Sequence, residues 1–201
     1  MIKPTALTLL AATTTTWQGY AANIQIVAGK VYLTGELTAN DGPVFQAQSA
    51  GLPPGTTLVL KSMGGSIESA FRIGEVVWTK HFTTFVPRYC LSACALVWLV
   101  GSPRRMSPGG IIGFHQAHNV DGNAVIWVNR AVTRYLESKG YSTEVQQFAL
   151  SAPPSGMAYL TKDQIRRLGI DVQIVPSGLS GLLPATAKPT SHNAAAAALR
   201  R

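Results

Sequence analysis

One segment, residues 57–86, limits the possible folds more than any other part of the chain. It contains an apolar β-rich run, the pair Gly64-Gly65, a stretch with helical apolar spacing that begins at Ser66, and a second short apolar run. Such a strand–helix–strand unit has parallel strands, and these are normally buried. Strand and helix patterns continue to alternate along the chain, so the sequence predicts an α/β protein.

Other segments extend this alternation. NIQIVAGKVYLTGEL alternates around Ala28-Gly29 and predicts a hairpin. SACALVWLVG is apolar all round and predicts a fully buried helix, and GGIIGFHQ predicts a strand that ends at His115. Thr161 and Gln164 form a capping-box pattern before Gly169, so a last short helix is expected there.

The two ends of the chain differ from its middle. Residues 1–22 contain Lys3, an apolar stretch interrupted by threonines, and small residues that suit signal-peptidase cleavage after Ala21. This pattern predicts a signal peptide, and a mobile N-terminal extension is the alternative. Residues 184–201 have no periodic apolar face and predict a disordered tail. Residues 23–183 are then expected to form a single domain of an exported, soluble protein.

Composition excludes several classes of function. Of the 201 residues, 46% are hydrophobic and 13% are charged, which is typical of a globular protein. The net charge of +8 comes from scattered basic residues without a nucleic-acid motif, so we expect no nucleic-acid partner. A solvated basic surface explains the charge most simply, and weak contact with anionic membranes or polymers is the alternative.

Three short patterns carry residues suited to acyl-transfer chemistry. Ser92 stands at the start of the predicted buried helix, where backbone N–H groups have no helical partner. His115 is a candidate for the base that a serine nucleophile needs, and the N–H groups of Gly65 and Ala93 are candidate donors to the oxyanion. Each pattern also has a structural explanation: a helix cap, a satisfied histidine and a tight glycine turn.

The only two cysteines, Cys90 and Cys94, flank Ser92. Export would permit a disulfide between them, provided that Cys90 precedes the helix. Two buried free thiols are the alternative. Because two cysteines are too few for a structural zinc site, we expect no metal, and we expect no other cofactor.

Four motifs occur in an order that resembles the proteolytic subunit of the Clp protease, ClpP. They are VYLTGEL, LKSMGGSIESAFRIGEVVWTKHFTTFV, CLSACALVWLVGSPRRMSPGGIIGFHQ and YLTKDQIRRLGID, and they span residues 31–171. The chain is particularly similar to exported ClpP-like proteins of bacteria with a C-x-S-A-C segment. The resemblance implies the ClpP/crotonase fold, a spiral of ββα units, and a serine peptidase that acts on peptides or proteins. We therefore expect a periplasmic location.

The resemblance also implies site residues. The family's nucleophile falls on Ser92, its base on His115, and its oxyanion donors on the backbones of Gly65 and Ala93. Its third catalytic residue, an aspartate, falls at or near Met157 and does not carry over.

Two residues are candidates to orient the imidazole of His115 in place of that aspartate, namely Ser155 and Asp163. Asp163 also has a local explanation, because an acid in the first turn of a helix is favoured by the helix dipole. The leading hypothesis is therefore a serine hydrolase with an unidentified third residue. The alternative is a catalytically inactive binding or scaffold protein on the same fold, and an acyl-CoA enzyme of the crotonase branch is a weaker third.

The remaining expectations concern partners and spare histidines. The resemblance makes residues 124–150 the region by which the family's subunits stack into rings. They are short here, so we expect no double ring, and a small homo-oligomer stays open. Export would separate the protein from cytoplasmic ATPases, so none is expected as a partner. His81 and His118 are predicted to be non-catalytic, the first at a helix end and the second in a polar loop.

Overall fold

The computed structural model describes residues 21–175. The predicted tail lies outside these residues, as does the predicted signal peptide except for its last two positions. In chain order the elements are β1 (Asn23–Val27), β2 (Lys30–Leu37), α1 (Asp41–Ser49), β3 (Thr57–Gly65), α2 (Ile67–Thr79), β4 (Thr83–Val86), β5 (Tyr89–Leu91), α3 (Ala93–Leu99), β6 (Arg104–Met106), β7 (Ile111–Phe114), α4 (Ile126–Ser138), α5 (Thr143–Ala149), β8 (Ala158–Tyr159), α6 (Lys162–Arg167) and β9 (Gln173–Ile174).

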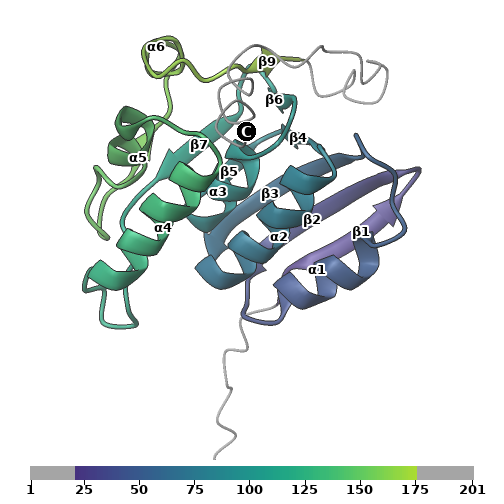
Figure 1. Cartoon of the computed structure of the whole chain (residues 1–201), viewed down its shortest axis with the longest axis horizontal. Coiled ribbons are helices and arrows are strands. Elements are labelled where there is room, and N and C mark those ends of the chain that lie inside the picture. The colour runs from purple at the N-terminus through teal and green to yellow at the C-terminus, as the bar shows by residue number, and fades with distance from the viewer. Residues whose placement is uncertain (1–20, 176–201) are drawn as a thin grey trace, which may run out of the picture.

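The nine strands form one mixed sheet that divides at β3 (Figure 1). On one side β3 pairs with β2, and on the other it pairs first with β4, over Thr57–Val59, and then with β5, at Ser62. β4 leads on to β6 and β9, whereas β5 leads on to β7 and β8. All of these pairings are parallel except β1 with β2 and β7 with β8. The division makes the sheet curl, and it places the ends of β3, β5 and β7 next to one another.

The predicted strand–helix–strand unit is confirmed as β3–α2–β4. Helix α2 begins where expected because the Ser66 side chain accepts a hydrogen bond from the Ser69 N–H at 3.2 Å. The expected hairpin is β1–β2, in which Ala28 and Gly29 both have positive φ, as a tight two-residue turn requires. The last predicted helix is α6, and its capping box at Thr161 is complete.

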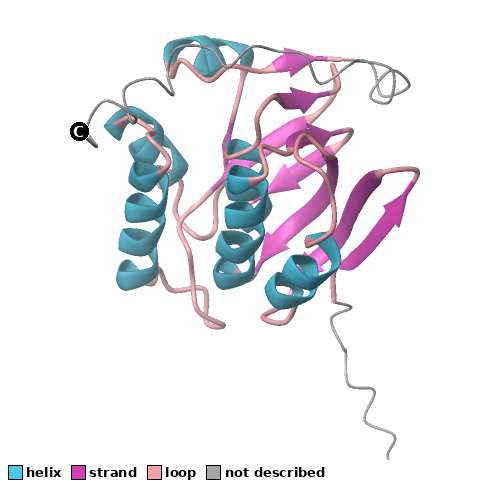
Figure 2. Ribbon diagram, turned by 45° about the vertical axis from the view of Figure 1, so that its right-hand side comes forward, coloured by secondary structure: helices cyan, strands magenta, loops and turns pink. Residues whose placement is uncertain are grey.

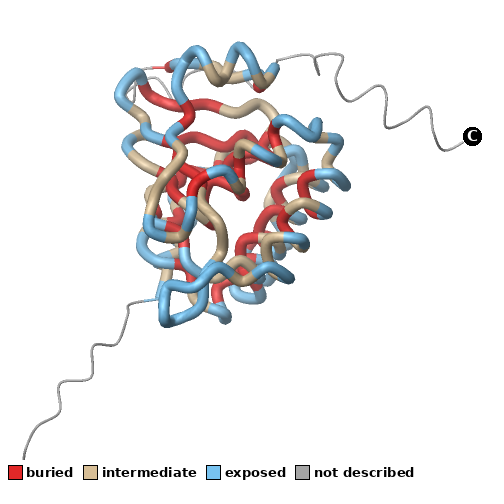
Figure 3. Tube along the Cα trace, turned by 90° about the vertical axis from the view of Figure 1, so that its left-hand side faces the viewer, coloured by how far each residue is buried: buried red, intermediate tan, exposed pale blue. Residues whose placement is uncertain are grey.

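The core lies between the sheet and the helices. Figure 2 shows the long helices side by side along one face of the sheet, and Figure 3 shows that buried residues run through the middle of the molecule. All seven residues of α3 are buried, as its all-apolar sequence predicts, and α3 packs between α2 and β3. The Trp98 indole donates to the Arg105 carbonyl at 3.1 Å, so its N–H is satisfied inside the core.

Three short strands, β5, β6 and β8, were not expected from the sequence. Each has three residues or fewer, which is too short for an alternating pattern. β5 matters most, because it leads directly into Ser92 and α3. No helix within residues 21–175 is long and apolar enough to cross a bilayer.

Candidate active site

Ser92 occupies a sharp turn between strand β5 and helix α3. Its backbone has φ 52° and ψ −126°, a conformation that a residue with a side chain rarely adopts and that costs on the order of 1–3 kcal/mol. Two backbone hydrogen bonds hold it there: the Ser92 N–H donates to the Gly113 carbonyl at 2.8 Å, and the Ala95 N–H donates to the Ser92 carbonyl at 2.9 Å. Strain at a strand-to-helix turn is the geometry that exposes a nucleophilic serine in hydrolases of another fold.

The serine hydroxyl is not used as a helix cap. Ser92 is the N-cap residue of α3, yet its side chain makes no capping hydrogen bond, and its Oγ has no other hydrogen-bond partner among residues 21–175. The structural explanation of Ser92 as a helix cap is therefore wrong. The Ala93 N–H belongs to the first turn of α3, where N–H groups have no partner within the helix.

The glycine that approaches Ser92 is Gly64 rather than Gly65. A Cβ atom added to Gly64 would lie 2.7 Å from Ser92 Cβ and 2.7 Å from the Leu91 carbonyl oxygen. A Cβ on Gly65 would instead collide with the backbone of Leu37 in β2. Gly64 donates its N–H to Ser62 Oγ at 3.0 Å, so this N–H is already engaged. Both glycines line the same pocket as the serine.

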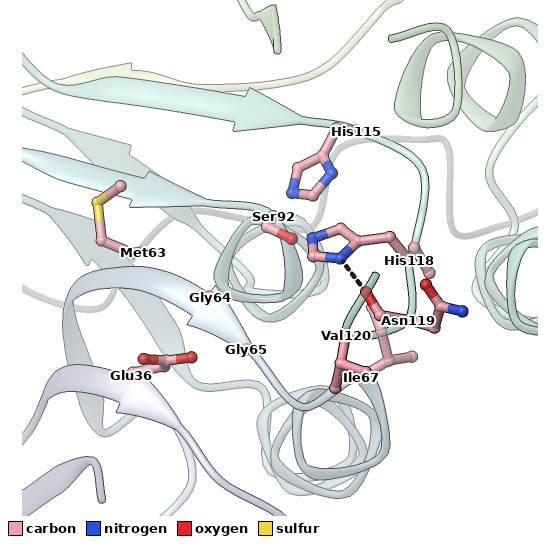
Figure 4. Close-up of a pocket in the computed structure, with 11 residues that line it drawn as sticks. Glu36, Met63, Gly64, Gly65, Ile67, Ser92, His115, His118, Asn119 and Val120 are labelled. Atoms are coloured by element: carbon pink, nitrogen blue, oxygen red, sulfur yellow. Dashed lines mark hydrogen bonds between the residues drawn. The ribbon is translucent and has the colours of Figure 1, made fainter. Parts of the chain in front are cut away.

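This pocket has a volume of about 430 Å³ and gathers the chemically active side chains (Figure 4). Ser92 and His115 both line it, so the structure brings together the two residues that the sequence predicted to act as a pair. Its wall also includes His118 and Glu36, which the sequence did not place in the site, and apolar side chains such as Met63 and Ile67. Nothing in the local sequence marks Glu36, which enters the pocket from the end of β2.

His115 directly follows strand β7 and is half-buried. In Figure 4 its Nε2 side faces Ser92. Its Nδ1 atom is buried and has no hydrogen-bond partner among the described residues. Burial lowers the pKa of His115, the neighbouring backbone of Gln116 opposes this shift, and the proximity of His118 lowers the pKa further. His115 is therefore neutral at physiological pH, as a general base must be.

Neither predicted orienter lies in the pocket. Asp163 forms an exposed ion pair with Arg166 in α6, and Ser155 is exposed in the turn before β8. The antiparallel register of β7 and β8 pairs Phe114 with Ala158, so Met157 is the next residue opposite His115. Its thioether side chain lies against Gly113, so the residue opposite His115 is apolar and supplies no carboxylate.

Cys90 and Cys94 are joined by a disulfide that bridges the Ser92 turn. Cys90 lies in β5, before the helix, so the spacing of four residues is compatible with a bond. Of the two alternatives considered from the sequence, the structure contains the disulfide rather than two free thiols. Both cysteines are fully buried, and the bond ties the end of the strand to the first turn of the helix.

The second histidine, His118, lies in the loop between β7 and α4. This loop is fixed at its base by two hydrogen bonds: the Ala117 N–H donates to Asn129 Oδ1 at 2.8 Å, and the Val125 N–H donates to the Ala117 carbonyl at 2.9 Å. The ring of His118 stacks on that of His115 with 5.6 Å between centroids. No group of three or more metal-ligating side chains occurs within residues 21–175.

Comparison with known proteins identifies the fold. No protein-family model matches the chain, and no curated protein sequence matches it. By structure, 494 solved chains match. One is a point mutant of ClpP1 from Listeria monocytogenes, with a TM-score of 0.56 and 18% sequence identity over 75% of this chain and 94% of that one.

The fold is that of ClpP. The prediction of a single-domain α/β fold of the ClpP type is confirmed. At 18% identity the likeness to ClpP establishes the fold alone, and a fold does not by itself define an activity. The chemistry must therefore be argued from the pocket.

Proposed function

We propose that this protein is a serine hydrolase of peptides or proteins, with Ser92 as nucleophile and His115 as base. The observation that carries the proposal is the strained turn at Ser92. This turn places a hydroxyl without a hydrogen-bond partner in the same pocket as the neutral imidazole of His115. Strain of this kind persists only where surrounding structure maintains it, and it concentrates at active sites. The ClpP fold supports the peptidase class, because the motif order that predicted the fold also predicted this pair.

The mechanism follows from these positions. Ser92 Oγ attacks a substrate carbonyl as its proton passes to the imidazole, giving a tetrahedral oxyanion. The backbone N–H groups of Ala93, in the first turn of α3, and of Gly65 are the proposed donors to that oxyanion. The imidazolium then protonates the departing amine, and water hydrolyses the acyl-enzyme by the reverse sequence.

A fluorophosphonate probe tests the proposal on the purified protein. Labelling of wild-type protein at Ser92 is expected, with loss of labelling in Ser92→Ala and a strong decrease in His115→Ala. Ser155→Ala is a matched control, because Ser155 is exposed and outside the pocket. Folded wild-type protein that remains unlabelled, or that labels at a serine other than Ser92, would refute the assignment.

A second candidate is a binding or scaffold protein on the same fold. It is favoured by two observations: the buried Nδ1 of His115 has no hydrogen-bond partner among the described residues, and Met157, opposite His115, is apolar. This candidate predicts that Ser92→Ala fully rescues a knockout strain. A failed rescue at normal protein level would exclude it.

We also infer that the protein works outside the cytoplasm, in the periplasm. The disulfide at Cys90–Cys94 supports this, because such bonds persist in oxidising compartments. The proposed substrates are then peptides or proteins that arrive without a cytoplasmic ATPase, and a small homo-oligomer is the proposed assembly. Fractionation of cells that produce the full-length chain tests the location, and recovery with the cytoplasm would contradict it.

A further inference from the structure

Two imidazole rings, rather than one, face the Ser92 hydroxyl. His118 lines the same pocket as Ser92 and His115, and its ring stacks on that of His115 at an interplanar angle of 27°. In Figure 4 the Nε2 side of the His118 ring is directed toward Ser92 Oγ, while its other nitrogen points to the backbone of Asn119. A histidine with this orientation can accept the proton that the serine hydroxyl must lose.

The tautomer of His118 is set by its own loop. Its Nδ1 atom lies 2.8 Å from the Asn119 carbonyl oxygen, and a carbonyl can only accept a hydrogen bond. Nδ1 therefore carries the proton, and Nε2 has a free lone pair on the side of the serine. In serine hydrolases this is the state that an orienting acceptor imposes on the catalytic histidine, with Nδ1–H held and Nε2 free.

His115 lacks such an acceptor at Nδ1: that atom is buried and has no hydrogen-bond partner among the described residues, so a proton there would be unsatisfied. His118 is exposed to solvent and holds its Nδ1–H against a carbonyl.

We propose that His118 is a second catalytic histidine, whose Nε2 gives the proton of Ser92 Oγ a second route beside the one to His115. This inference rests on the proposed function. As Ser92 Oγ bonds to the substrate carbonyl carbon, its proton moves to His118 Nε2, while Nδ1–H stays on the Asn119 carbonyl. As the bond from that carbon to the leaving group breaks, the same proton passes from Nε2 to the leaving group. Hydrolysis of the acyl-enzyme repeats the two transfers with water.

The rate of labelling by a fluorophosphonate tests this role. His118→Ala is expected to lower the second-order rate constant by about 10²-fold, the lower end of what a general base contributes. His118→Asn keeps a side-chain N–H near the position of Nδ1 but has no basic nitrogen, so it should lose the same factor. His81→Asn is the matched control: His81 is exposed, lies outside the pocket and has φ 52°, which asparagine tolerates.

Added imidazole separates a base from a merely structural residue. Because His118 is exposed, free imidazole can occupy the space left in His118→Ala, and it should restore part of the labelling rate there but none in Ser92→Ala. Wild-type labelling in either His118 variant, or a loss that imidazole does not restore, would overturn the inference. Absence of labelling in the wild type would instead refute the proposed function, so the two failures are distinguishable.

Discussion

Replacing Gly64 by alanine tests whether the close approach of β3 to the Ser92 turn is required by the site. Two costs are expected. Gly64 has φ 104°, which an alanine adopts at a cost of about 1–3 kcal/mol. The new Cβ would also lie 2.7 Å from Ser92 Cβ and 2.9 Å from the Ala93 backbone nitrogen, an overpacking worth about 1–3 kcal/mol.

The sum, about 2–6 kcal/mol, is a large part of the roughly 5–15 kcal/mol that stabilises a typical domain. Gly140→Ala is the matched control, because Gly140 also has a positive φ of 78° but no atom near the position of its Cβ. We expect urea denaturation to show that Gly64→Ala loses about 1–3 kcal/mol more than Gly140→Ala.

The same displacement should affect the chemistry. In Gly64→Ala the serine turn must move to relieve the contact, so labelling of Ser92 by a fluorophosphonate should decrease strongly, whereas Gly140→Ala should label like the wild type. If the two variants unfold at the same urea concentration and label at the same rate, the argument for a required close approach is wrong.

Four further results are expected. Met157→Asp should increase the labelling rate, because a carboxylate opposite His115 would hold its Nδ1–H; a folded variant that labels no faster than Met157→Leu would contradict this. Reduction of the disulfide should lower the free energy of unfolding by about 2 kcal/mol, which is the loop entropy expected for a cross-link between residues four positions apart. The same treatment should not affect a Cys90→Ala/Cys94→Ala variant. Tyr135→Phe should leave stability unchanged or raise it by up to about 1 kcal/mol, since the Tyr135 hydroxyl is buried without a partner among the described residues, and a clear loss in thermal denaturation would contradict this. Finally, the pKa of His115 is lower in the folded state than its ordinary value of about 6.5, so the unfolded state binds the proton more readily and stability should decrease as the pH falls below that value; His115→Asn should flatten this part of the pH profile.

The long, strongly patterned elements could be predicted from the sequence. Helix α2 is determined by a serine cap and apolar spacing, and α3 by a run with no polar face, so both formed where expected. The strands β5, β6 and β8 have two or three residues, and their pairing is decided by neighbours distant in the chain. A local pattern cannot predict such strands.

The candidate site divides in the same way. Ser92, His115 and the paired glycines stand at element ends, where sequence patterns and family resemblance identify them. His118 and Glu36 have no such pattern. His118 lines the pocket because the loop after β7 folds over it, and Glu36 lines it because β2 pairs with β3. The sequence could not show which of the two glycines approaches Ser92, because both belong to the same turn and only the register of β2 and β3 distinguishes them.

The sequence by itself determined the class of the protein: an α/β domain with a serine at the head of a buried helix and a histidine at the end of a strand. Apolar periodicity and capping residues act over a few neighbouring positions, so they can be read from the chain alone. Only the tertiary structure decided what surrounds that serine, namely the disulfide across its turn and the second imidazole, that of His118. These contacts join residues on different strands and loops, and they exist only once β3, β5 and β7 lie side by side.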